Sequence, residues 1–417
     1  MKTAGRVARF WRSLGPGLIT GAADDDPSGI ATYSLAGAQF GTGLLWMPLV
    51  SWPLMWAVQV TCARIGMVTG RGLMAAMRQR YSRPVLIVIC VLLFSANAVN
   101  IGADLSGMAD AAELLSGVNS HIWVVLFGLG IMFGTVRLRY RQMARVLKWL
   151  SLVLGAYVIT AFISGPKWGD IFREMLSFHL PRTRDAVGMV VAIFGTTISP
   201  YLFFWQASEE VEEEKTEGRI GRERVGATDQ ALQARSVDVV SGTFVATVSM
   251  FFIMLTTALT LHASGLTQPA TTSEVASALE PLAGKAAMWL YTIGLLGTGA
   301  LAIPTLAGAS AYAVAELLAL RQGMDERFHR APAFYAIILL SIGVAIGMDF
   351  IHVSPVRALY WTAVINGLLA PILLVAIAQL SGDQTVMHQQ PAARFTRAMV
   401  WFTAAVMAAA GIAMFVI

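Results

Sequence analysis

Long apolar stretches dominate the sequence of this chain. A helix needs about 20 apolar residues to cross a bilayer, and runs of about that length recur from one end of the chain to the other. They lie at roughly 14–40, 43–63, 84–115, 121–136, 146–165, 186–207, 236–263, 286–320, 331–350, 354–380 and 398–417. The pattern predicts an all-α polytopic membrane protein with about eleven transmembrane helices, forming a single transmembrane domain over 1–417.

Polar residues interrupt the first run. Three adjacent aspartates, Asp24 to Asp26, are followed by Pro27 and Gly29. An Asp at the centre of a membrane helix costs about 2.5–3.5 kcal/mol, and Pro and Gly favour a break in the helix. Unwound backbone is tolerated at membrane depth only where it is buried or lines a cavity. Carboxylate and carbonyl oxygens bind hard divalent cations, so the pattern favours a cation site near the bilayer midplane.

Two other interpretations of this segment remain open. The aspartates are also compatible with the end of a short span that faces water. Residues 1–23 also resemble a signal peptide, because a basic start precedes an apolar stretch and small residues follow it. The glycines and proline at 15–17 make a poor signal core, and ten further apolar runs follow. We therefore favour the midplane site.

The sixth run is interrupted in the same way as the first. Residues 195–200 read Gly-Thr-Thr-Ile-Ser-Pro. Broken helices at corresponding places, five spans apart, are typical of transporters built from inverted repeats, whose site lies between the two breaks. We therefore predict two inverted five-helix repeats, about 14–165 and about 186–380, with an extra helix at about 398–417. Thr196 and Ser199 become candidate oxygen ligands beside Asp26.

Charge is scarce and unevenly distributed. Only 13% of residues are charged and the mean hydropathy is +0.64, whereas soluble domains are about 25% charged. With the N-terminus inside, 24 of the 30 Lys and Arg fall in cytoplasmic segments, as the positive-inside rule requires. We expect a bacterial-type inner (plasma) membrane protein with a cytoplasmic N-terminus and an outside C-terminus. The net charge of +5 then reflects topology, and no nucleic-acid partner is expected.

One long charged segment, 208–235, lies on the predicted cytoplasmic side. It carries five glutamates within 209–214, followed by several basic residues. We expect a cytoplasmic charged loop that forms a solvated helix. Collection of cations near an inner mouth is the alternative role.

Enzyme signatures are missing from the sequence. It contains no His-Glu-x-x-His, no phosphate-binding glycine loop and no Gly-x-Ser-x-Gly, and neither Cys62 nor Cys90 belongs to a metal-binding spacing. We expect a protein that is not an enzyme and that holds no resident cofactor. Its expected partners are the lipid bilayer and a divalent metal ion as substrate, and the sequence sets no oligomeric state.

Several motifs resemble the Nramp family of divalent metal transporters. In the first run Asp26-Pro27-Ser28-Gly29 is similar to the family's Asp-Pro-Gly-Asn. In the third run Ile101-Gly102-Ala103-Asp104-Leu105 is similar to Ile-Ala-Thr-Asp-Leu. In the sixth run Ser199-Pro200-Tyr201 lies where the family has Met-Pro-His. With the eleven runs, the resemblance covers nearly the whole chain.

The departures from the family pattern concern the ligands. The family's Asn falls on Gly29, its Met on Ser199 and its His on Tyr201, while the acid expected three residues after Asp104 is Gly107. In the family the Met sulfur favours manganese and iron, and the His and acids are associated with proton movement. A larger, all-oxygen site suits a hydrated hard ion such as Mg²⁺. The pattern therefore resembles the divergent, Nramp-related magnesium transporters.

These observations together predict an importer of a divalent cation, Mg²⁺ or alternatively Mn²⁺, that works by alternating access without strong proton coupling. Asp26, Gly29, Thr196 and Ser199 form the expected metal site. Four further residues are candidates for the permeation path or for support of the ligands: Asp25, Asp104, Asn100 and Asn366.

Three rival functions stay open at this point. The first is a proton-coupled Mn²⁺ or Fe²⁺ importer of the ordinary Nramp type, in which Asp104 moves protons. The second is a transporter of a small organic solute, which three aspartates disfavour when the solute is anionic. The third is a membrane sensor or scaffold that transports nothing and acts through 208–235.

Overall fold

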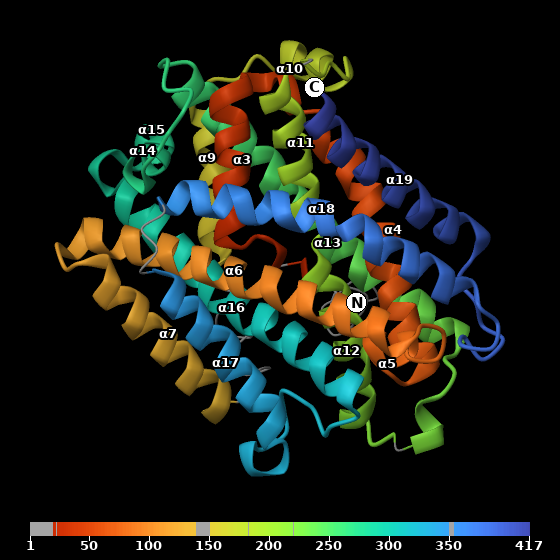
Figure 1. Ribbon diagram of the computed structural model, residues 1–417. Helices are drawn as coiled ribbons and strands as arrows, with labels where there is room; N and C mark the ends of the chain where they lie inside the picture. Colours follow the sequence, from red (N-terminus) through yellow and green to blue (C-terminus); the bar gives the residue numbers. More distant parts are fainter. Residues whose placement is uncertain (1–19, 22, 139–150, 182, 220, 350–353) are drawn as a thin grey trace, which may run out of the picture.

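The computed structural model describes residues 20–21, 23–138, 151–181, 183–219, 221–349 and 354–417. The start of the first apolar run, residues 146–150 of the fifth run and the basic segment 139–148 lie outside these ranges. Every regular element in the described ranges is helical (Figure 1). The predicted all-α polytopic membrane fold is therefore confirmed.

The described helices match the predicted runs in order. The first two runs give α3 (Pro27–Phe40) and α4 (Met47–Thr69), and a short helix α5 (Leu73–Met77) follows. The other long helices are α6 (Arg83–Ser116), α7 (Ser120–Arg137), α9 (Gly155–Ile163), α11 (Arg184–Thr197), α12 (Pro200–Thr216), α13 (Asp229–Thr257), α16 (Ala287–Leu318), α17 (Pro332–Met348), α18 (Pro355–Gly382) and α19 (Arg394–Val416).

By length and composition, seven described helical segments can each cross a membrane. The number rises to eight if the bent pair α3 and α4, which turns by 114°, counts as one span. The expected eleven is higher because it counts α3 and α4 as two spans and includes two runs that give short helices, α9 with nine residues and α17 with 17. Each of the eleven runs nevertheless contains a helix. The inverted-repeat relation between the two halves remains a prediction.

Both predicted breaks are present. The chain is helical up to Asp24, bends at Asp25, is extended at Asp26, and becomes helical again at Pro27. The second break falls at Ile198 and Ser199, between α11 and α12. Both second halves begin with a proline, whose fixed φ and missing N–H suit the first turn of a helix. The two breaks therefore have the same local cause.

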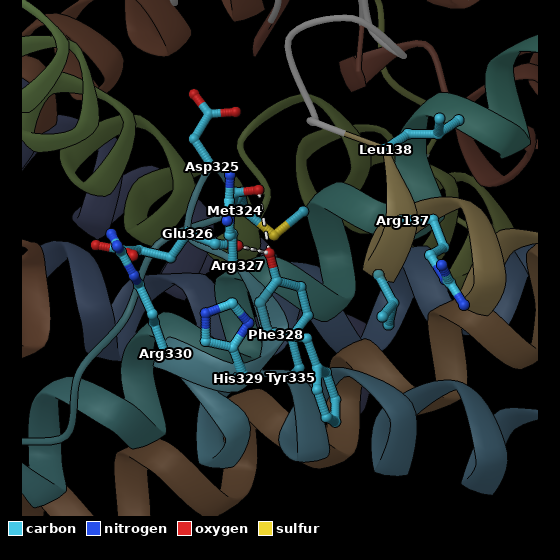
Figure 2. Close-up of a pocket in the computed structure, with 11 residues that line it drawn as sticks. Arg137, Leu138, Met324, Asp325, Glu326, Arg327, Phe328, His329, Arg330 and Tyr335 are labelled. Carbon is cyan, nitrogen blue, oxygen red and sulfur yellow. Dashed lines mark hydrogen bonds between the residues drawn. The ribbon is translucent and has the colours of Figure 1, made fainter.

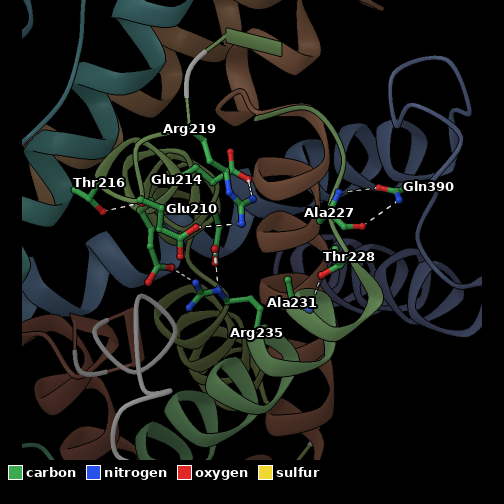
Figure 3. Close-up of polar contacts among 11 residues, drawn as sticks. Glu210, Glu214, Thr216, Arg219, Ala227, Thr228, Ala231, Arg235 and Gln390 are labelled. Atoms are coloured by element: carbon green, nitrogen blue, oxygen red, sulfur yellow. Dashed lines mark hydrogen bonds and ion pairs between the residues drawn. The ribbon is translucent and has the colours of Figure 1, made fainter. Parts of the chain in front are cut away.

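For the first part of 208–235, the predicted helix is present but the prediction that it is solvated is wrong. Residues 208–216 continue α12, and Glu209, Glu210, Glu212 and Glu214 are buried. Burial is possible because cations from neighbouring segments compensate these charges. Arg235 on α13 pairs with Glu210 at 2.7 Å, with Asp238 at 2.7 Å and with Glu213 (Figure 3).

Two further ion pairs extend this charged region. Lys215 contacts Glu212 at 2.6 Å, and Arg219 contacts Glu214 at 3.4 Å. Beside the cluster, Gln390 exchanges two hydrogen bonds with the backbone of Ala227 (Figure 3). The ion pairs fix the end of α12 against α13, and the Gln390 bonds fix the start of α13 against the chain before α19. The ion pairs lie far along α12 from the break at Ser199.

Glycines allow close helix crossings around the breaks. A Cβ added to Gly195 on α11 would collide with the backbone of Ala363 and Gly367 on α18, and one added to Gly367 would meet Val191. Small residues at such crossings allow two helix backbones to approach, a common packing mode in membrane bundles. The position of α11, and of the break at its end, therefore depends on contact with α18.

Replacing Gly195 with Ala should destabilise the fold, because the added methyl overlaps the α18 backbone. We expect a cost of about 1–3 kcal/mol, seen as a lower melting temperature of the purified protein in detergent. Gly130→Ala on α7 is the matched control, since nothing lies within 4 Å of its added Cβ. Equal melting temperatures of the Gly195→Ala and Gly130→Ala variants would contradict the proposed crossing.

Candidate metal site

Asp26 lies at the first break and organises it. Its side chain is buried and caps α3: Oδ1 accepts hydrogen bonds from the Gly29 N–H at 2.7 Å and the Ser28 hydroxyl at 2.7 Å. The second oxygen, Oδ2, accepts from the Asn100 amide on α6 at 3.3 Å. Capping, the structural alternative to ion binding, is thus present. It fixes the carboxylate in place and leaves a lone pair free on Oδ2, since Oδ1 already accepts two hydrogen bonds.

The missing side chain of Gly29 leaves a space bordered by oxygen. From the position that a Cβ would occupy, the nearest atoms are Thr196 Oγ1 at 3.2 Å, the Asp24 carbonyl oxygen at 3.3 Å and Asp26 Oδ1 at 3.4 Å. Thr196 lies in the last turn of α11, and its hydroxyl has no hydrogen-bond partner among the described residues. Three of the four predicted ligand positions, Asp26, Gly29 and Thr196, therefore surround one point between the two breaks.

Ser199 and Tyr201 occupy the second break. Ser199 is the N-cap residue of α12, but its buried hydroxyl makes no capping bond and has no partner among the described residues. The buried Tyr201 hydroxyl, one residue into α12, donates to the carbonyl of Ala23 at 2.9 Å. That carbonyl belongs to the end of the first half-helix, so Tyr201 ties the two breaks together directly.

Two other acidic candidates lie in the same buried region. Asp104 on α6 is buried, is close enough to Asp26 for the two charges to interact, and faces the backbone N–H of Ser28. Asp25 is buried and faces Ser249 on α13. Successive residues point in different directions, which explains why Asp25 leaves the Gly29 space while Asp24 contributes its backbone carbonyl.

The asparagine candidates divide into two groups. Asn100 contacts Asp26 directly, as described above. Asn97, one turn earlier, instead donates to Ser310 Oγ at 2.9 Å and to the Leu306 carbonyl at 3.2 Å, both on α16. These are hydrogen bonds between helices. Asn366 on α18 is buried, and its side-chain oxygen has no partner among the described residues.

The donor set around Gly29 determines its chemistry. The described residues contain no group of three or more His, Cys, Asp or Glu arranged to hold a metal ion. The space is instead formed by one carboxylate, one carbonyl and one hydroxyl, all hard oxygen donors. The carbonyl ends of broken helices favour cations at such sites. A hydrated divalent cation is the ligand that suits this donor set.

Some contributors were not anticipated from the sequence as parts of the site. Ser28 is one, and its spacing two residues after an N-cap Asp was a readable local signal. The bond from Tyr201 to Ala23 joins residues 178 positions apart, so no local pattern indicates it. Ser249, opposite Asp25, likewise comes from a distant helix.

Comparison with known proteins finds relatives among metal transporters. The family model described as "Natural resistance-associated macrophage protein-like" (Nramp) matches residues 17–417. A relative from Ralstonia nicotianae, named divalent metal cation transporter MntH, is 27% identical over 413 residues, covering 97% of this chain and 91% of that protein.

Solved structures with the same fold include two transporter types. The crystal structure of the Eremococcus coleocola manganese transporter superposes with a TM-score of 0.73 at 19% identity, covering 97% of this chain and 86% of that one. The nucleobase-cation-symport-1 family transporter Mhp1 superposes with a TM-score of 0.61 at 14% identity, covering 97% and 90%. With a family model matched over nearly its whole length and a multi-pass helical fold, this chain belongs to the Nramp family.

Proposed function

We propose that this protein imports a divalent metal cation by alternating access, with Mg²⁺ as the favoured substrate. The observation that carries the proposal is that the three atoms nearest to the Cβ position of Gly29, at 3.2–3.4 Å, are all oxygens. These oxygens mark one wall of the proposed site, next to the Gly29 backbone. Mg²⁺ dehydrates reluctantly and usually keeps several of its waters when it binds such oxygens.

The residues that replace the family motif support this preference. The soft sulfur that the family places at position 199 is here a serine hydroxyl, and the amide at position 29 is absent. Both changes remove protein ligands and leave room for water. The resemblance to manganese importers, including the relative named MntH, supports Mn²⁺ as the second substrate.

The driving force proposed here is the membrane potential. An inside-negative potential contributes about 2.3 kcal/mol per charge per 100 mV, and hence roughly twice that for a divalent ion. Import down this gradient needs no coupled proton. The titratable His of the family is replaced by Tyr201, whose hydroxyl is engaged with Ala23.

One observation favours a second candidate function, proton-coupled import of Mn²⁺. Asp104 is buried, lies close enough to Asp26 for the two charges to interact, and faces the backbone N–H of Ser28. A carboxyl group in that setting is suited to carry a proton or to receive the ion. The two functions differ in whether protons enter with the metal.

Replacing Asp26 with Asn tests whether the negative charge of its carboxylate is needed for transport. The amide oxygen retains the cap on Gly29 while the charge is lost, so we expect a folded protein whose Mg²⁺ uptake into proteoliposomes falls roughly 10- to 100-fold. Asp383→Asn, which removes the charge of a partly exposed carboxylate paired with Arg80, is the control and should transport normally. Unchanged uptake by the Asp26→Asn variant would exclude this carboxylate as the ion's main contact.

Adding a side chain at Gly29 tests whether the space beside it is needed for ion transport. In Gly29→Ala the new methyl occupies the position surrounded by the three oxygens, so Mg²⁺ uptake should fall at least about tenfold, while Gly130→Ala leaves it unchanged. Melting temperatures of both purified proteins establish that each variant is folded. Wild-type uptake by the Gly29→Ala variant would show that the ion binds elsewhere.

Ser199→Met tests the origin of selectivity. A thioether at this position introduces a soft ligand, so Mn²⁺ should compete with Mg²⁺ uptake more strongly than in the wild type. Ser199→Leu has similar bulk without sulfur and separates the ligand effect from the change in volume. If both variants shift selectivity equally, sulfur is not the determinant.

A further inference from the structure

A pocket outside the ion path lies at one end of the bundle. It has a volume of about 820 Å³ and is formed by the end of α7 together with residues 324–330, which precede α17 (Figure 2). Met324 and Tyr335 form its buried floor, whereas Arg137, Arg327 and Arg330 are exposed at its rim. Figure 2 shows Arg137 and Arg330 on opposite sides of the pocket, with His329 and Tyr335 between them.

Positive charge prevails around the pocket. Two acidic residues also line it, Asp325 and Glu326, and Glu326 is paired at 3.0 Å with Arg321, which lies outside the lining. Counting Arg321, four arginines face two acids, a formal excess of two positive charges. Arg137 lies 5.7 Å from the centre of the Phe133 ring. The three rim arginines make no ion pair with a described residue, so their guanidinium groups are available to an anion.

Buried tyrosines hold the basic segment in place. The Tyr335 hydroxyl contacts the carbonyls of Glu326 at 2.6 Å and Met324 at 3.3 Å. The Tyr312 hydroxyl on α16 accepts from the Met324 N–H at 3.1 Å. The backbone that carries Arg327 and Arg330 is therefore anchored to two helices, so little order has to be gained when a ligand binds.

An apolar stripe leads to the pocket along α7. Ile122, Leu126, Leu129 and Phe133 are exposed and lie at helical spacings of three and four residues on one face. Arg137 follows one turn after Phe133, at the pocket. On α17, Leu340 and Val344 are also exposed. An anionic headgroup at one end and an apolar surface along the span match the chemistry of a phospholipid.

We propose that this pocket binds the headgroup of an anionic phospholipid whose acyl chains lie along α7. Arg137, Arg327 and Arg330 contact the phosphate, for which guanidinium groups are well suited, and basic pockets between membrane helices bind anionic headgroups in this way. The α7 stripe distinguishes a lipid from free phosphate as the ligand. The site is independent of which ion the protein transports.

The test measures lipid binding by the purified full-length protein in detergent. Phosphatidylglycerol should raise the melting temperature in a saturable manner, and phosphatidylcholine or inorganic phosphate should not. In the double variant Arg137→Gln/Arg330→Gln, half-maximal stabilisation should require at least about tenfold more phosphatidylglycerol. Arg394→Gln, which changes another exposed arginine, is the matched control and should behave as the wild type.

Each alternative outcome contradicts the proposal in a distinct way. Equal stabilisation by phosphatidylcholine would show that the apolar stripe alone binds lipid. Equal stabilisation by inorganic phosphate would make the ligand a soluble anion. If the double variant responds to phosphatidylglycerol as the wild type does, the lipid binds at another surface of the protein. The melting temperature without lipid should be the same in all three proteins, because the substituted arginines are exposed.

Discussion

A carboxylate held inside a membrane domain is the feature on which the rest of this structure depends. Without partners, Asp26 would make the first span expensive to insert. The chain compensates by unwinding at Asp25 and Asp26, so that the carboxylate caps α3 and receives a further hydrogen bond from Asn100. The same unwinding directs the Asp24 carbonyl toward the Gly29 space. One local solution thus stabilises the aspartate and creates a cation-binding surface.

The second break completes that surface because the two breaks are coupled. Tyr201 donates to the Ala23 carbonyl across them, and close contact of Gly195 with α18 sets where α11 ends. Further along α12, the buried Glu210 pairs with Arg235 of α13, which fixes the two helices against each other. Any movement of α12 relative to its neighbours in an alternating-access cycle must either keep or exchange two sets of contacts. These are the hydrogen bond of the Tyr201 hydroxyl and the ion pairs of Arg235.

The sequence predicted what depends on local chemistry and missed what depends on distant contacts. Apolar runs predicted the helices, and Pro27 and Pro200 marked where broken helices resume, because proline acts through its own backbone. The buried state of Glu210 was not predicted, since the compensating Arg235 lies 25 positions away on another helix. The bond from Tyr201 to Ala23 was missed for the same reason. Asp26, Gly29 and Thr196 were expected to meet only because two breaks five spans apart indicate a shared site.

Uptake by the wild-type protein, reconstituted into liposomes with an imposed inside-negative potential, tests the central claim most directly. Reporters for Mg²⁺, Mn²⁺ and internal pH are followed together. We expect that Mg²⁺ enters and that the internal pH stays constant. Entry of Mn²⁺ with acidification, and without entry of Mg²⁺, would contradict it and would make Gly29 and Ser199 tolerated changes in a proton-coupled manganese site.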